Sequence, residues 1–145
     1  MSNVKLIPIY NPTAIIKNFK HFSEGFERVM EFTGDDTNLP KIFNELLAGE
    51  LLLWTGFYND EYRGFITTKI IETPFGNRAL WLMHCYVKSG TKPDWIFEGI
   101  NIIKDFAKKQ NCTKIKFYTI RDKAWERRLN EYNFKKGYQE FVMEV

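Results

Sequence analysis

The most constraining feature of the sequence is a strand, loop, helix and strand that follow one another in its last third. Apolar residues from Ala79 to Val87 predict a buried strand, and a turn of Gly, Lys and Pro separates it from a helix of about Asp94 to Lys109 and a second strand, Lys114 to Thr119. This order puts a helix N-terminus beside the C-terminal end of a strand. Backbone N–H groups there lack intrahelical partners and lie at the positive end of the helix dipole, so they suit an anionic or carbonyl-bearing ligand.

The rest of the chain predicts helices before this unit, a meander leading into it, and a helix and strand after it. Helical spacing of apolar residues predicts a first helix that ends at about Phe32 and a shorter one that Gly49 stops. The other expected elements are strands at Val4 to Tyr10, Leu51 to Tyr58, Tyr62 to Glu72 and Phe134 to Val145, and a helix at Lys123 to Tyr132. The sequence therefore predicts an α/β (α+β) fold with a mixed, mostly antiparallel sheet flanked by helices.

Composition limits the classes of protein. A chain of 145 residues fits one domain, residues 1–145, and the net charge of +3 is far below that of a dedicated nucleic-acid binder, so nucleic acid is not an expected partner. No apolar run is long enough to span a bilayer, and the N-terminus has no signal-peptide pattern. Two cysteines and two histidines give no zinc spacing, so we expect no metal, reduced thiols and a cytoplasmic protein.

Two segments carry a resemblance to a known family. Phe106 to Cys112 is similar to a helix exit of the form A-x-x-x-G-x, and Trp125 to Phe134 is similar to a helix that ends in Y-x-x-x-G-F. With the order of elements, these segments resemble the Gcn5-related N-acetyltransferase (GNAT) superfamily. Gly90 to Trp95 and Arg121 to Arg128 resemble in particular the atypical GNAT-like proteins of bacteriophages. The resemblance implies a single GNAT-like domain whose sheet is splayed between the strands Ala79–Val87 and Lys114–Thr119.

The resemblance also implies a cofactor, acetyl-CoA, and an unidentified amine as acetyl acceptor. Backbone groups of Tyr86 and Val87 would hold the acetyl carbonyl and pantetheine, and Lys92, Trp95 and Ile96 lie in the stretch that matches the family's pyrophosphate loop. We expect a cleft lined by Tyr86, Trp95 and Tyr118.

That stretch departs from the family pattern. It has no glycine after Gly90, Pro93 donates no N–H, and Asp94 places a carboxylate near the expected phosphates. Asp94 is more simply explained as the N-cap of the helix, and Trp95 as a ring packed at its first turn rather than stacked on a ligand.

The catalytic candidates are His84 and Tyr118. Strand alternation puts His84 on one face with Tyr86, and its intrinsic pKa suits a general base, although a packed core histidine is the simpler interpretation. The family's general acid is a Tyr at the position of Leu129, which cannot donate a proton, so Tyr118 is the substitute candidate, and a half-buried sheet aromatic is its simpler interpretation. Asn133 replaces the motif glycine and tolerates a left-handed conformation.

Two features leave other functions open. A surplus of rings on the meander could form a protein interface, so that a catalytically inactive GNAT fold would serve as a virion-associated or other protein-binding component. These rings are Trp54, Phe57, Tyr58, Phe75 and Trp81. A cluster of Arg121, Lys123, Arg127 and Arg128 could bind phosphate, but is more simply a solvated helix face.

Overall fold

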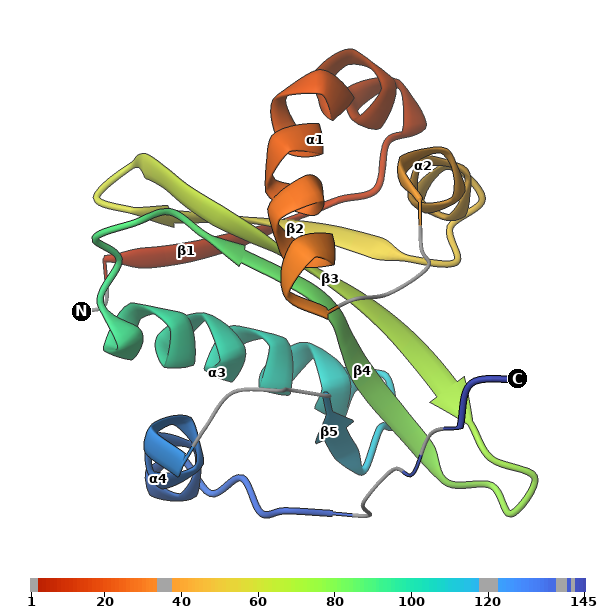
Figure 1. Ribbon diagram of the computed structural model, residues 1–145, viewed down its shortest axis with the longest axis vertical. Helices are drawn as coiled ribbons and strands as arrows, with labels where there is room; N and C mark the ends of the chain where they lie inside the picture. The colour runs from red at the N-terminus through yellow and green to blue at the C-terminus, as the bar shows by residue number, and fades with distance from the viewer. Residues whose placement is uncertain (1–2, 34–37, 118–122, 138–140, 142) are drawn as a thin grey trace.

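The computed structural model describes residues 3–33, 38–117, 123–137, 141 and 143–145. Five strands form one mixed sheet in the order β1-β2-β3-β4-β5, with helices on both faces (Figure 1). The elements are β1 (Val4–Ile9), α1 (Pro12–Thr33), α2 (Leu39–Leu47), β2 (Leu52–Tyr58), β3 (Glu61–Glu72), β4 (Arg78–Val87), α3 (Pro93–Lys109), β5 (Lys114–Lys116) and α4 (Lys123–Glu131). The predicted α+β fold is confirmed.

The first four strands run antiparallel, and β5 pairs with β4 in parallel. Asn59 and Asp60 connect β2 to β3 with φ angles of 50° and 63°, the conformation that a tight two-residue hairpin turn requires and that Asn and Asp tolerate better than most residues. The predicted hairpin and meander are therefore confirmed.

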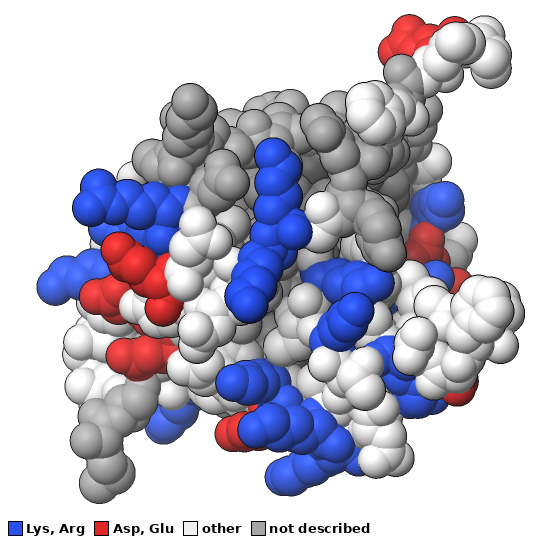
Figure 2. Space-filling view, turned by 90° about the horizontal axis from the view of Figure 1, so that it is seen from below, with Lys and Arg blue, Asp and Glu red and all other residues white. Residues whose placement is uncertain are grey.

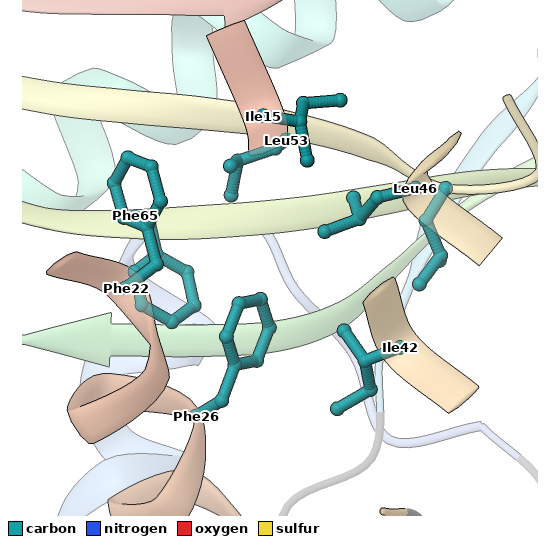
Figure 3. Close-up of a cluster of buried hydrophobic side chains, with 8 residues drawn as sticks. Ile15, Phe22, Phe26, Ile42, Leu46, Leu53 and Phe65 are labelled. Carbon is teal, nitrogen blue, oxygen red and sulfur yellow. The ribbon is translucent and has the colours of Figure 1, made fainter. Parts of the chain in front are cut away.

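Helices α1 and α2 cover one face of the sheet, whereas α3 covers the other and α4 lies outside α3 (Figure 1). The core under α1 and α2 is built from apolar side chains of both helices and of β2 and β3, seven of which are labelled in Figure 3. They are Ile15, Phe22, Phe26, Ile42, Leu46, Leu53 and Phe65. This predominantly apolar packing holds α1 over the ends of β3 and β4, where the candidate residues lie.

Gly25 allows α1 to lie against the sheet. A Cβ atom at this position would be 2.6 Å from a ring carbon of Phe65 and 2.7 Å from one of Tyr86. Because real Cβ contacts are longer than this, any larger residue would push the helix or the rings aside. The helix can therefore approach β3 and β4 closely only with glycine here.

A second core lies between α3 and the other face of the sheet. Trp54, Ile66 and Leu80 of the strands pack against Ile103 and Ala107 of the helix. The Trp54 indole N–H donates to Thr68 Oγ1 at 2.9 Å, which satisfies both buried polar groups.

Several expectations about the ends of the chain are not met. The final strand predicted for Phe134 to Val145 is wrong for the described residues of that range, none of which is in a strand. The last described strand residue of β5 is Lys116, and Tyr118 and Thr119 of the predicted strand lie outside the described residues.

Some general properties complete the description. Both cysteines, Cys85 and Cys112, are free thiols. Among the described helices, none has the length and apolarity that a membrane span requires. Within the same part of the chain, no group of three His, Cys, Asp or Glu residues is arranged to hold a metal ion.

Candidate active site

In the described residues, β4 and β5 pair over a short stretch. Ala79, Leu80 and Trp81 of β4 lie opposite Lys114, Ile115 and Lys116. Beyond Trp81, β4 continues to Val87 with β3 as its partner. Phe117 is described and is not in a strand, so the described part of β5 ends at Lys116, in agreement with the predicted divergence of the two strands; residues 118–122 lie outside the described residues.

A β-bulge lies just beyond this pairing. Thr67 pairs with His84 and the next residue, Thr68, pairs with Leu82, so Met83 is the extra residue on β4. The bulge interrupts the alternation of faces. Leu80 and Leu82 face the α3 core, whereas His84 and Tyr86 face α1.

His84 is half-buried beneath α1. Its Nδ1 is 2.7 Å from the hydroxyl of Thr67, which is fully buried, and its ring meets Phe26 edge-on with ring centroids 5.5 Å apart. The hydrogen bond and the ring contact fix the orientation of the imidazole. This placement suits a general base held by a neighbouring hydroxyl, and it equally suits a packed histidine, so the catalytic role stays a prediction.

Tyr86 and Trp95 both contribute to the lining of one small pocket, as predicted, and Tyr118 lies outside the described residues. The two rings, however, lie on opposite sides of the sheet. The Tyr86 ring packs on Phe65 with centroids 5.5 Å apart, on the α1 side, whereas Trp95 belongs to α3. Successive residues of a strand point to opposite faces, so the Cys85 and Val87 positions, and not Tyr86, face α3.

The loop from Lys88 to Lys92 joins β4 to α3 and is held by Arg63 of β3. The Arg63 Nε and Nη2 atoms donate to Thr91 Oγ1 at 3.0 and 2.9 Å, and Nη2 also donates to the Ser89 carbonyl at 3.0 Å. Within the loop, Gly90 has a φ of 85°, and the Thr91 N–H donates to the Lys88 carbonyl at 3.2 Å. Arg63 thus fixes a turn whose left-handed residue has to be glycine or a small polar residue.

Trp95 is a packing element, as predicted. Its ring stacks on Tyr58 with centroids 3.7 Å apart and planes 13° apart. Arg63 and Lys92 approach the same ring, with Cζ 6.0 Å and Nζ 5.7 Å from its centroid. These contacts join the first turn of α3 to β2, β3 and the loop, and cation–π attraction adds to the stacking.

The start of α3 differs from the prediction that Asp94 is its N-cap. The helix begins at Pro93, and the N-cap is Lys92, whose side chain makes no capping hydrogen bond. The reason is that proline, with its fixed φ and missing N–H, is favoured at the first helical position, which moves Asp94 into the first turn. There its carboxylate still lies near the positive end of the helix dipole.

Asp94 has a partner that the sequence did not reveal, Tyr132 at the end of α4. The Tyr132 hydroxyl donates to Asp94 Oδ1 at 2.8 Å, and its ring stacks on Phe97 with centroids 3.9 Å apart. The hydrogen bond to the carboxylate raises the pKa of Tyr132, because the bond is lost with the proton. The contact attaches α4 to the start of α3. Tyr132 lies three residues after Leu129, which occupies the position of the family's general acid.

The neighbouring Asn133 confirms one prediction. It has a φ of 68°, the left-handed conformation expected for the residue that replaces the motif glycine. The Phe134 N–H then donates to the Leu129 carbonyl at 2.9 Å, which closes the end of the helix.

A small apolar pocket lies between the first turns of α3 and the sheet. Its volume is about 60 Å³, and its lining includes Cys85, Val87, Trp95, Ile96 and Gly99. A Cβ atom added at Gly99 would meet no atom within 4 Å. Ligand pockets are several times larger, so this space by itself does not enclose a cofactor. The predicted cofactor roles of Tyr86, Val87, Lys92, Trp95 and Ile96 stay predictions.

Sequence reasoning missed Arg63 and Tyr132. Arg63 is 28 residues from Thr91 and Tyr132 is 38 residues from Asp94, and neither is part of a motif. No local pattern could have paired them, because each pair is brought together by strand pairing or helix packing.

Comparison with known proteins gives no match by sequence and many by structure. No protein-family model and no curated protein sequence matches the chain. The aminoglycoside acetyltransferase meta-AAC0020 from an uncultured soil metagenomic sample is similar with a TM-score of 0.70 at 12% identity, over 99% of this chain and 97% of that one.

Two further solved structures have the same architecture. Ribosomal-protein-alanine N-acetyltransferase from Brucella melitensis biovar Abortus 2308 is similar with a TM-score of 0.71 at 15% identity, over 98% and 99% of the two chains. A predicted acetyltransferase with acetyl-CoA from Clostridium acetobutylicum is similar with a TM-score of 0.69 at 15% identity, over 97% and 96%. Likeness at such low identity concerns the fold, and the chain has the fold of the Gcn5-related N-acetyltransferases.

Proposed function

We propose that the chain is an acetyl-CoA-dependent N-acetyltransferase that transfers an acetyl group to an amine. The observation that carries this proposal is the loop that Arg63 holds between the end of β4 and the start of α3. The likeness of fold to acetyltransferases, one of them with acetyl-CoA, supports it over almost the whole chain.

The residues of the β4–α3 loop fit a diphosphate. Gly90 lets the backbone turn without a side chain in the way, Lys88 and Lys92 are exposed cations, and the α3 dipole adds positive potential. The carboxylate of Asp94 would repel phosphates, but it accepts a hydrogen bond from Tyr132, which reduces its demand for other partners. The departure from the family's glycine pattern is thereby offset in part.

Lys92, Trp95 and Ile96 would hold the phosphates and the adjoining part of acetyl-CoA, and the backbone of Tyr86 and Val87 would hold pantetheine and the acetyl carbonyl. When bound, acetyl-CoA supplies an activated acetyl thioester. The amine has to lose a proton when it attacks, and His84 is the proposed base, with its ring held through Nδ1 by Thr67. Tyr118 is the proposed acid.

Titration calorimetry with acetyl-CoA and CoA tests the proposal first, because binding does not require a known acceptor. Release of CoA with polyamines, peptides and aminoglycosides then tests transfer. We expect micromolar binding of both cofactors, as is common for enzymes. Absence of binding at millimolar acetyl-CoA would overturn the proposal.

One observation favours a second function, a non-catalytic protein of the same fold in a virion or another assembly. Leu129 occupies the acid position, and the nearby Tyr132 hydroxyl is engaged by Asp94. The rings proposed for an interface give this alternative little support, since Trp54 is buried and of the five only Phe75, 92% exposed, is fully accessible. Cofactor binding without CoA release for any acceptor would favour it.

A further inference from the structure

The charge of the chain is distributed very unevenly. Residues 104–136 contain eleven Lys or Arg and four Asp or Glu, whereas the other residues contain ten Lys or Arg and fourteen Asp or Glu. The whole-chain net charge of +3 therefore conceals one segment of net charge +7 and a remainder of −4. Such asymmetry is a better indicator of a polyanionic partner than the net charge is.

The fold gathers most of this segment on the α3 side of the molecule. It comprises the end of α3, the edge strand β5, α4 and the residues that follow α4, and both helices lie below the sheet in Figure 1. Seen from that side, Lys and Arg side chains are spread across the surface, and Asp and Glu lie mainly at its margins (Figure 2). Lys114 and Lys116 of β5 point to the opposite face, because Ile115 between them packs on the α3 core and Lys116 lies over the Trp81 ring. We call the other described cations of this segment the basic face: Lys104, Lys108, Lys109, Arg127, Arg128, Lys135 and Lys136.

The basic face is not neutralised by the protein itself. All its members are exposed. The ion pairs found among the described residues involve Lys5, Arg28, Arg63 and Arg78, and so none of the basic face. The charges are therefore available to an external partner.

The composition of the basic face indicates what that partner is. Five of its seven cations are lysines, which are depleted in protein–protein interfaces, whereas such interfaces have an apolar or aromatic centre. The large hydrophobic side chains found exposed in the described ranges belong to β1, α1, β3, β4, the adjoining turns and residues 141–145, and so none belongs to residues 104–136. Lysines without apolar anchors suit a phosphate backbone that is bound through charge alone.

We propose that the basic face binds the phosphate backbone of nucleic acid without sequence specificity. The contact lies on the α3 side, whereas His84 lies on the α1 side of the sheet, so a bound nucleic acid would not cover the candidate base. The proposal does not depend on acetyl transfer.

Fluorescence anisotropy with labelled 20-base-pair RNA and DNA duplexes of arbitrary sequence, between 50 and 200 mM NaCl, tests it. If about four phosphates are neutralised, the logarithm of the association constant should fall with the logarithm of salt concentration with a slope of about −3 to −4 for DNA. We expect both duplexes to bind, because the contact is with the backbone.

The test variant is Lys104→Gln/Lys108→Gln/Lys109→Gln, and the matched control is Lys17→Gln/Lys20→Gln/Lys41→Gln, which removes the same charge from exposed lysines of α1 and α2. The first should weaken binding at least tenfold and reduce the slope by about 2 to 3, and the control should change affinity less than threefold. Equal weakening by both variants would overturn the proposal, as would no binding at 50 mM NaCl. The proposal would also be overturned if polyglutamate or anionic vesicles displaced the labelled duplex as strongly as unlabelled duplex does at equal concentration of negative charge.

Discussion

Arg63 and Thr91, 28 residues apart, are joined by two hydrogen bonds of 3.0 and 2.9 Å from one guanidinium to one hydroxyl. The same guanidinium reaches the Ser89 carbonyl and lies 6.0 Å from the centre of the Trp95 ring. A single side chain of β3 therefore sets the shape of the loop between β4 and α3. This loop is where the phosphates of a cofactor would lie in the proposed function.

Replacing Arg63 should weaken acetyl-CoA binding through the loop. We expect Arg63→Gln to raise the Kd for acetyl-CoA about tenfold or more in titration calorimetry, because the loop then has to be ordered on binding. Glu61→Gln is the control, since it removes only the ion pair to Arg63 at 3.3 Å and leaves the bonds to the loop. A folded Arg63→Gln variant with wild-type affinity would contradict this role.

Trp95→Ala should destabilise the fold. The half-buried ring is stacked on Tyr58, so its loss should lower the free energy of unfolding by about 2–4 kcal/mol in urea titrations. Trp95→Phe keeps a stacked ring and should recover part of this loss. An unchanged free energy of unfolding combined with lost acetyl-CoA binding would instead make Trp95 a ligand contact.

Two helical glycines should respond in opposite directions to the same substitution. Gly99→Ala gains helix propensity and meets no atom within 4 Å, so it should stabilise the protein by about 0.5–1 kcal/mol. Gly25→Ala gains the same propensity but collides with the Phe65 and Tyr86 rings, so it should destabilise by about 1–3 kcal/mol. Urea titration of both variants checks this, and a Gly25→Ala variant as stable as Gly99→Ala would mean that α1 does not lie this close to the sheet.

Tyr62 should make stability fall at high pH. Burial is the main reason why its pKa is raised above the usual value, and the neighbouring Tyr86 raises it further. Above about pH 10 the unfolded chain loses the Tyr62 proton while the folded chain keeps it, so the unfolded state is favoured as pH rises, and below that pH there is no effect.

Urea titrations at pH 9 and pH 11 measure this difference. Tyr62→Phe should lose less stability between the two values than the wild type, whereas Tyr10→Phe, which alters a tyrosine that is 68% exposed, should behave as the wild type does. The explanation fails if Tyr62→Phe shows the same pH dependence as the wild type.

His84→Gln should lower the rate of CoA release by about 100-fold or more while the affinity for acetyl-CoA stays nearly unchanged, because the base acts on the amine. Thr67→Val should have a smaller effect on kcat and shift the pH–rate profile, since Thr67 only holds the ring through Nδ1. Full activity of His84→Gln would remove His84 as the base and direct attention to Tyr118 or a water relay.

The sequence by itself determined the elements whose signals are local. Asn59 and Asp60 encode the turn between β2 and β3, Gly49 follows the end of α2 with a φ of 76°, and Asn133 takes the left-handed conformation expected of it. Such signals act over a few residues, through the backbone conformations that each residue tolerates. They therefore do not depend on how the rest of the chain packs. The order of these elements was enough to predict the GNAT fold and the divergence of β4 from β5.

Tertiary structure decided what depends on distant partners. The bulge at Met83 arises from the register of β4 against β3, Arg63 meets Thr91 only because those strands place the loop beside it, and Tyr132 meets Asp94 only because α4 packs on α3. The predicted N-cap at Asp94 and the final strand were wrong where the structure describes them, and the rings of Tyr86 and Trp95 lie on opposite sides of the sheet. To predict each of these features correctly, one has to know which surfaces of the helices and strands pack together. That packing depends on burial and strand pairing across the whole folded chain, and no local periodicity of the sequence records it.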